Sequence, residues 1–324
     1  MRPRWSISAD GADITAHLAD RLLYLSVTDE AGIKSDAVEI RLDDRDGRIA
    51  WPRTGAELSV SMGYAGALSP MGLYQVDQLH HEGPPATLTI KASAAAFKAS
   101  LKVPRTQGRD GVTIGALVAE IAARHGLQPR VAPDLAGIVL ARVDQTNESD
   151  LHLLTRIAKE RDAIAKPAGG ALVFAARGEG KSASGKVLRA VAVASTEVVS
   201  WSVDVAERGK VAAVIASWTD PDTGNRVPER VGAADGTTRT LRRTYSSPDE
   251  ARSAARAALD ASDRGAATLD LTIIGNPVVA AETRLTLTGI RPGIDGTWSV
   301  TRAEHRLDAS GYQTSITAET PKTP

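Results

Sequence analysis

The sequence predicts a mainly β protein of the α+β class, with two β-barrel domains on either side of a small α/β middle domain. Three observations lead to this prediction. Short alternating apolar segments separated by turn residues fill the first hundred positions, helical spacing begins near residue 111, and alternation returns from Val187 onward. We therefore expect domains at 1–100, 101–190 and 191–324, with one helix, 247–264, inserted in the C-terminal barrel region.

The first domain is predicted from apolar residues at every second position, because such residues share one face of a strand. A polar turn at 43–47 separates the first two of these strands. The alternating sets are Val38, Ile40 and Leu42; Leu58, Val60 and Met62; Tyr74 and Val76; and Leu88 and Ile90. Several antiparallel strands at this spacing are typical of a barrel or a small sandwich.

The middle domain begins with a helix over 113–126, which Thr113 can cap at its start and Gly126 can close at its end. A second helix follows, with either Asn147 or Ser149 as its N-cap and with a buried stripe that includes Leu154. The segment 169–174 then returns as a turn and a strand, and the glycine- and serine-rich loop 178–185 marks a domain boundary.

The last domain starts with short strands around Trp201 and Ile215, which are followed by the best local signal of the chain. Ser247-Pro248-Asp249-Glu250 has the pattern of a capping box with proline at the first helical position, which predicts the inserted helix. Four strands then close the chain. Their apolar sets are Leu269, Leu271 and Ile273; Leu285 and Leu287; Trp298 and Val300; and Tyr312, Thr314 and Ile316.

Composition excludes several classes of function. The 324 residues include 39 Lys plus Arg and 39 Asp plus Glu, so the chain has no excess positive charge for nucleic-acid phosphates. The absence of cysteine excludes disulfide frameworks, thiolate metal sites and cysteine nucleophiles. The N-terminus lacks the apolar core of a signal peptide, and no apolar run is long enough for a membrane span, so we expect folding in a cytosol.

Individual motifs give no catalytic, cofactor or metal site. The segment 178–182 resembles the end of a phosphate-binding loop, but its first glycine is missing and no helix follows it. The loop 44–47 has part of the spacing of a calcium-binding loop without its essential carboxylates, and we interpret it as a hairpin turn. His80 and His81 point to opposite faces of a strand, and His125 fits a cation at a helix C-terminus.

Two alternatives stay open at this point. A cell-wall hydrolase needs two carboxylates about 5 to 9.5 Å apart, and such a pair leaves no local signature in a sequence. A carbohydrate-binding or adhesion module needs exposed aromatic platforms, for which 5 Trp, 5 Tyr and 2 Phe are few.

Several strings, taken in order, resemble the late control D family of phages, the baseplate hub of contractile tails, which is related to the hub part of the type VI secretion spike. The strongest match is the string 145–158, and strings around Leu42, Pro52 and Tyr74 fit as well. Ala281 departs from the family pattern, which usually has glycine there. The matching motif residues, to which we assign structural roles, are Gln145, Glu148, Ser149, Asp150, Gly275, Pro277, Gly289, Asp295, Gly296 and His305.

The resemblance covers almost the entire chain and implies a structural role without catalysis. It implies tube-type barrels and a homotrimer, in which two barrels per chain form a pseudo-sixfold ring that joins the inner tail tube to the central spike. The implied partners are copies of the chain itself, the tube protein and the spike protein, with tape measure and baseplate wedge proteins as further candidates. It implies no cofactor, no sequence-specific nucleic acid and no membrane insertion. The implied location is the tail baseplate of the virion, assembled in the bacterial host cytoplasm.

Overall fold

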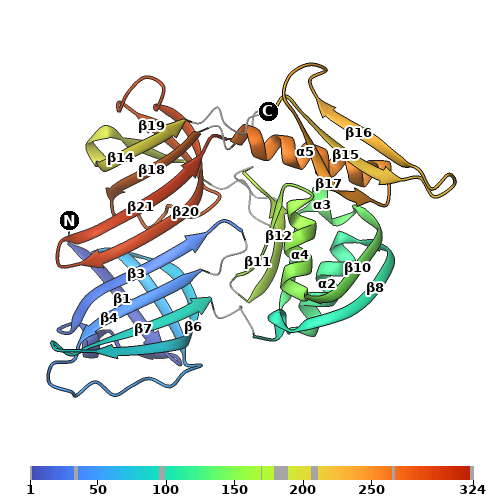
Figure 1. Ribbon diagram of the computed structural model, residues 1–324. Helices are drawn as coiled ribbons and strands as arrows, with labels where there is room; N and C mark the ends of the chain where they lie inside the picture. The colour runs from blue at the N-terminus through green and yellow to red at the C-terminus, as the bar shows by residue number, and fades with distance from the viewer. Residues whose placement is uncertain are drawn as a thin grey trace.

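The computed structural model describes residues 2–32, 36–94, 99–168, 170–178, 189–205, 211–264 and 267–321. Strands dominate these ranges, as the sequence predicts, and they fall into two β units and two accessory units (Figure 1). None of the described helices is long and apolar enough to cross a membrane.

The N-terminal β unit comprises seven strands and one short helix. Its elements are β1 (Pro3–Ala9), β2 (Ala12–Asp13), α1 (Thr15–Leu18), β3 (Leu22–Glu30), β4 (Ala37–Asp43), β5 (Glu57–Tyr64), β6 (Ala67–Glu82) and β7 (Thr87–Ala94). The predicted apolar sets face one core, in which Leu42, Val60 and Met62 have no exposed surface. The turn at 44–47 does not close a hairpin, because β4 pairs with β3 and β7 whereas β5 pairs with β1 and β6.

The C-terminal β unit has six strands around a second core. Its elements are β13 (Val191–Ala194), the 3₁₀ turn η2 (Ser195–Glu197), β14 (Val198–Val205), β18 (Ala267–Ile274), β19 (Arg284–Thr288), β20 (Gly296–Asp308) and β21 (Gly311–Glu319). The four predicted closing strands are confirmed, and Leu271 and Leu285 lie in this core as expected.

The two β units form one continuous sheet rather than two separate ones. β3 pairs antiparallel with β20 from Glu30–Arg302 to Tyr24–Asp308, so the strand order is β14-β18-β21-β20-β3-β4-β7-β6-β5-β1-β2, with β13 and β19 attached beside β20. Leu307 and Tyr312 of the C-terminal unit also pack into the N-terminal core. The sheet therefore fixes the two units side by side.

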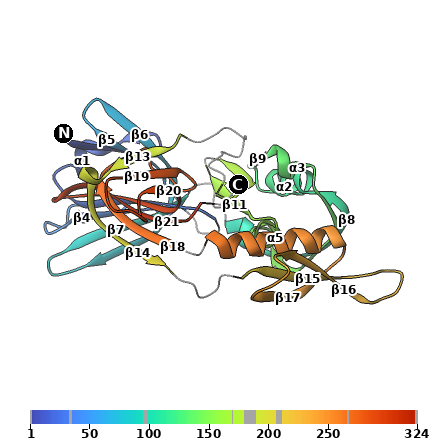
Figure 2. The same cartoon turned by 90° about the horizontal axis from the view of Figure 1, so that it is seen from above.

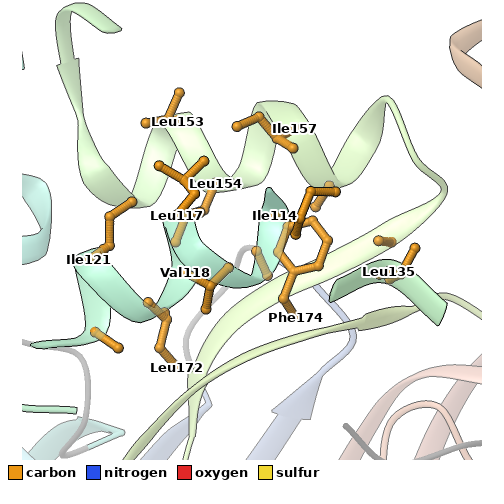
Figure 3. Packing of buried hydrophobic residues seen from close by; sticks show 14 of the residues in the cluster. Ile114, Leu117, Val118, Ile121, Leu135, Leu153, Leu154, Ile157, Leu172 and Phe174 are labelled. Carbon is orange, nitrogen blue, oxygen red and sulfur yellow. The ribbon is translucent and has the colours of Figure 1, made fainter. Parts of the chain in front are cut away.

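The α/β unit forms the middle of the chain and has its own core (Figure 3). Its elements are η1 (Ala99–Lys102), β8 (Pro104–Thr113), α2 (Ile114–Arg124), β9 (Gln128–Val131), α3 (Pro133–Ala136), β10 (Val139–Ser149), α4 (Asp150–Lys159), β11 (Ala163–Ala168) and β12 (Ala171–Ala176). Thr113 caps α2 by accepting a hydrogen bond from the Ala116 amide, as predicted. Ser149, and not Asn147, caps α4 by accepting from the His152 amide.

The inserted segment is larger than the predicted helix. It is a separate outer unit of three strands, β15 (Ala213–Thr219), β16 (Arg226–Gly232) and β17 (Thr238–Tyr245), covered on one face by α5 (Pro248–Arg264). The sequence pattern predicts Ile215 in the C-terminal barrel domain, and this prediction is wrong because period-two alternation does not reveal which sheet a strand joins. Ser247 does cap α5 as predicted, accepting from the Glu250 amide at 3.3 Å. The described helix ends at Arg264, the last residue of the predicted range 247–264.

Both accessory units lie on the same side of the double β unit, which is clear when the molecule is seen from above (Figure 2). The loop 178–182 lies almost entirely outside the described residues. The described residues contain no group of three or more His, Asp or Glu side chains that could hold a metal ion.

Candidate functional site

Eight consecutive strands of the continuous sheet form an arc that is the main candidate for an assembly surface. The arc runs β14-β18-β21-β20-β3-β4-β7-β6, four strands from each β unit, and every neighbouring pair is antiparallel. Figure 1 shows most of these strands stacked from the top to the bottom of the two units. One face of the arc covers both hydrophobic cores, and the other is polar.

The polar face contains two hollows. One, of about 410 Å³, spans β20, β3, β4 and β7, and the other, of about 260 Å³, continues over β14, β18 and β21. Arg302 lines both hollows, so the polar surface is continuous across the join between the two units.

Four cations on the polar face each have a carboxylate partner. The pairs are Lys91–Glu39 at 3.6 Å, Arg41–Glu82, Arg302–Glu304 at 2.7 Å, Arg302–Glu30 at 3.2 Å and Arg306–Asp308 at 3.0 Å. A cation that is already paired with a carboxylate attracts a phosphate group more weakly than an unpaired cation does, because its charge is already balanced. These four side chains therefore leave little unbalanced positive charge on the face.

The two ends of the arc have unpaired backbone. Within the described part of the chain β14 pairs with β18 alone, and the β6 segment 78–82 pairs with β7 alone, since the β5 ladder ends at Gln75. β14 also exposes apolar side chains, with Val205 77% and Val199 55% exposed. Free edges of this kind pair readily with strands of another chain.

Asp150 is the centre of a buried polar cluster in the α/β unit. Its carboxylate accepts hydrogen bonds from Gln145 Nε2 at 2.9 Å, Arg124 Nη1 at 2.9 Å and His125 Nε2 at 2.8 Å. Arg105 lies 3.4 Å away as a further ion partner. Burial alone would raise the pKa of Asp150, but these hydrogen bonds outweigh burial and hold the pKa below its usual value.

The motif residues around Asp150 fix the start of α4. Gln145 is 1% exposed and also donates to the Glu148 carbonyl oxygen at 2.8 Å. Glu148 binds the Arg156 guanidinium through both carboxylate oxygens, at 2.7 and 3.1 Å. Ser149 is the N-cap described above. The four residues Gln145, Glu148, Ser149 and Asp150 thus connect β10 to α4 and α2.

A Ser–His–Asp chain of contacts runs through this cluster, which sequence reasoning missed. Ser100 Oγ lies 2.8 Å from His125 Nδ1, and His125 Nε2 contacts Asp150. In a catalytic triad the carboxylate stabilises the imidazolium that forms during the reaction. Here Arg124 and Arg105 already balance the charge of Asp150, so the contacts tie η1 to α2 and α4.

The C-terminal motif residues lie far from this cluster, in the core of the C-terminal β unit. His305 is 1% exposed, and its Nε2 donates to the Val279 carbonyl oxygen at 2.9 Å while Nδ1 faces the Tyr312 hydroxyl at 3.0 Å. Burial lowers the pKa of His305 below its usual value. A Cβ at Gly275 would lie 2.2 Å from Cγ of Tyr312, so only glycine fits beside this ring.

The other C-terminal motif residues shape turns. Asp295 accepts hydrogen bonds from the amides of Gly289, Ile290 and Arg291, which closes the connection from β19 to β20. Gly296 has φ +132°, a conformation that side chains disfavour. Pro277 lies in the turn after β18. The ten motif residues therefore form two separate structural groups rather than one site.

Comparisons with known proteins bear on the family of the chain. The sequence profile of the phage tail baseplate hub (GPD) matches residues 111–311. The chain is 31% identical to the "Probable baseplate hub protein" of Escherichia phage P2 over 98% of its own length and 93% of that protein. This relative is named for a structural part of a tail and not for a reaction.

Solved structures share the fold. The 43 kDa tail protein of prophage MuSo2 from Shewanella oneidensis has a TM-score of 0.74 at 17% identity, covering 99% of both chains. A type VI secretion system component of E. coli has a TM-score of 0.61 at 12% identity, covering 100% of this chain and 77% of that one. The profile match and the identity to the P2 protein show that the chain belongs to the phage tail baseplate hub family and is a structural component of the tail, not an enzyme.

Proposed function

We propose that three copies of the chain close into a ring that joins the inner tube of a contractile tail to its central spike. The observation that carries this proposal is the eight-strand arc with a free edge at each end. The four-strand halves of the arc play the part of the two tube-type barrels expected from the resemblance. Two similar halves per chain give the ring a pseudo-sixfold symmetry.

The direction of the strands permits closure. Eight strands that alternate in direction place β6 antiparallel to β14, so the β14 edge of one copy can extend the β6 edge of the next. This contact is heterologous and closes a ring only if the rotation between copies is right. Three arcs of eight strands would give a cylinder of 24, wider than the 16- to 18-stranded barrels that already enclose a channel.

The two rims of such a ring would differ. The accessory units occur once per chain and lie on one side of the double β unit (Figure 2), so their rim has threefold symmetry. The opposite rim presents two similar β units per chain. We assign the pseudo-sixfold rim to the tube protein and the threefold rim to the spike, with wedge and tape measure proteins as further partners. The channel between them would be lined by the polar face.

Domain limits at 1–100, 101–190 and 191–324 remain part of this proposal. The ten motif residues act in it as internal supports that hold the arc and the accessory units in shape. The complete ring would reside in the virion baseplate after assembly in the host cytoplasm.

Engineered cysteines test the ring directly, because the chain has no cysteine of its own. Ser202→Cys lies on β14 and His80→Cys on β6, at opposite ends of one arc. A short bis-maleimide should link the doubly substituted protein into dimers and trimers, with no larger species. Each single variant should give no trimer. Cross-linked species of more than three chains, or no cross-link between copies, would refute the proposed closure.

A further inference from the structure

The contact between the accessory units and the continuous sheet differs in kind from the cores. Each of the four hydrophobic clusters is confined to the β units, to the α/β unit or to the outer unit. Between α4, β11 and α5 there is instead a hollow of about 280 Å³, lined largely by alanines such as Ala158, Ala163 and Ala257. Hydrogen bonds and ion pairs cross the boundary between these units and the sheet.

Lys166 of β11 makes the first of these contacts. Its side chain is only 14% exposed, and its ammonium donates to Asp29 at 2.9 Å, to the Glu30 carbonyl oxygen at 2.9 Å and to Asp36 at 3.2 Å. Asp29 in turn accepts from the Ala281 amide at 2.9 Å. One lysine of the α/β unit thus binds the N-terminal β unit directly and reaches the C-terminal β unit through Asp29.

Arg264, the last residue of α5, makes the second contact. It is 2% exposed and binds the Asp162 carboxylate of the α/β unit with two nitrogens, while its Nε lies 3.2 Å from Glu319 of β21. Glu282 adds a hydrogen bond from the Gly178 amide at 2.6 Å. Arg264 therefore links the outer unit, the α/β unit and the sheet.

The Lys166 contact has one negative charge too many. Asp29 and Asp36 both face a single ammonium. Burial and the charges of these two carboxylates also raise the pKa of Tyr74 of β6. Arg302 of β20 balances the neighbouring Glu30. Burial and the charge of Asp29 raise the pKa of Asp36 to about 6. Acidification from pH 7.5 to 5 removes the surplus charge and leaves the Lys166–Asp29 pair intact.

We infer that the α/β unit and the outer unit are docked on the sheet through a reversible ionic junction, formed by Lys166 and Arg264 with their carboxylates, which tightens when the pH falls. Removal of one partner of a desolvated ion pair is costly, whereas the pair itself adds little net stability, so such a junction opens more easily than a packed core. Opening of this ionic junction would let the accessory units turn relative to the ring without unfolding. It does not depend on the number of copies in the ring.

The experiment measures a distance across the junction. Spin labels at Arg48→Cys in the N-terminal β unit and Asp134→Cys in the α/β unit occupy exposed positions. Lys166→Met and Arg264→Met should broaden the distribution of label distances at pH 7.5 at least twofold, with circular dichroism unchanged. The matched control is Arg142→Met, which breaks exposed pairs within the α/β unit and should leave the distribution narrow. Equally narrow distributions in all variants would overturn the inference.

Asp36→Asn provides a second test that does not require loss of a buried cation. The distribution of label distances in the wild type should narrow when the pH is lowered from 7.5 to 5, because Asp36 takes up its proton in the docked state. The Asp36→Asn variant should be narrow at both pH values. If Asp36→Asn instead keeps the pH dependence of the wild type, Asp36 does not govern the junction.

Discussion

Replacement of Asp150 by Asn tests the role of the buried cluster in the α/β unit. Asparagine keeps the size and one acceptor oxygen but removes the negative charge that faces Arg124, His125 and Arg105. Breaking a fully buried ion pair costs about 3–5 kcal/mol. Arg124 is 23% exposed and keeps Glu120 as a partner at 2.6 Å, so we expect the lower half of this range, about 3–4 kcal/mol.

The assay is chemical and thermal unfolding followed by circular dichroism. For a unit of this size 1 kcal/mol corresponds to about 4–8 °C, so the midpoint of thermal unfolding of the α/β unit should fall by roughly 12–32 °C. Asp110→Asn is the matched control, because its carboxylate is 73% exposed and its pair with Arg142 lies at the surface. It should change stability by less than about 1 kcal/mol. Equal effects of the two substitutions would refute the reasoning.

The pH dependence of Asp150 has a definite sign. Since its folded-state pKa is below the usual value, its contribution to stability is complete above the unfolded pKa and is lost as the pH falls through the folded pKa. The wild type should therefore lose stability below about pH 4 more steeply than Asp150→Asn does. Parallel stability curves for the two proteins below pH 4 would contradict this assignment.

Three further predictions concern other parts of the molecule. Leu271→Asp or Leu285→Asp places an unpaired charge in the C-terminal core and should lower stability in urea by about 3–5 kcal/mol; an unchanged midpoint would show that the strand assignment is wrong. Gly275→Ala should cost about 2–3 kcal/mol by its collision with the Tyr312 ring, and Gly275→Ala combined with Tyr312→Leu should recover part of the loss in the same assay, whereas no recovery would place the cause elsewhere. A fluorophosphonate probe should leave Ser100 unlabelled and the protein should release no soluble peptidoglycan fragments, whereas labelling that Ser100→Ala abolishes would reveal a catalytic serine.

Local signals in the sequence predicted the helices well because the decisive contacts span only a few residues. Thr113, Ser149 and Ser247 each cap a helix by accepting a hydrogen bond from an amide three residues on. Asn147 has the same capping chemistry as Ser149, but it lies three residues before Asp150, where α4 begins, and has φ +46°. Ser149 directly precedes the helix with the extended φ −73° of an N-cap, so position along the chain and not side-chain chemistry decides which residue caps α4.

Long-range pairing could not be predicted in the same way. The β3–β20 ladder joins residues such as Ser26 and Arg306, whose alternating patterns fit any sheet. Ile215 shows the same ambiguity, since its strand joins the outer unit instead of a barrel. The sequence similarly placed His125 at a helix end, but its contact with Asp150 depends on how α2 and α4 pack. The motif residues could be identified from the family resemblance. The edges of the arc could be identified only once the order of the strands in the sheet was known.

The most direct test of the ring is the mass of the purified protein in solution, combined with electron microscopy of the same particles. With a chain of 34.0 kDa, we predict a particle of three chains whose end view shows six similar lobes around a channel. A particle that stays monomeric at every concentration, or a closed ring with another number of chains, would contradict the proposed hub assembly.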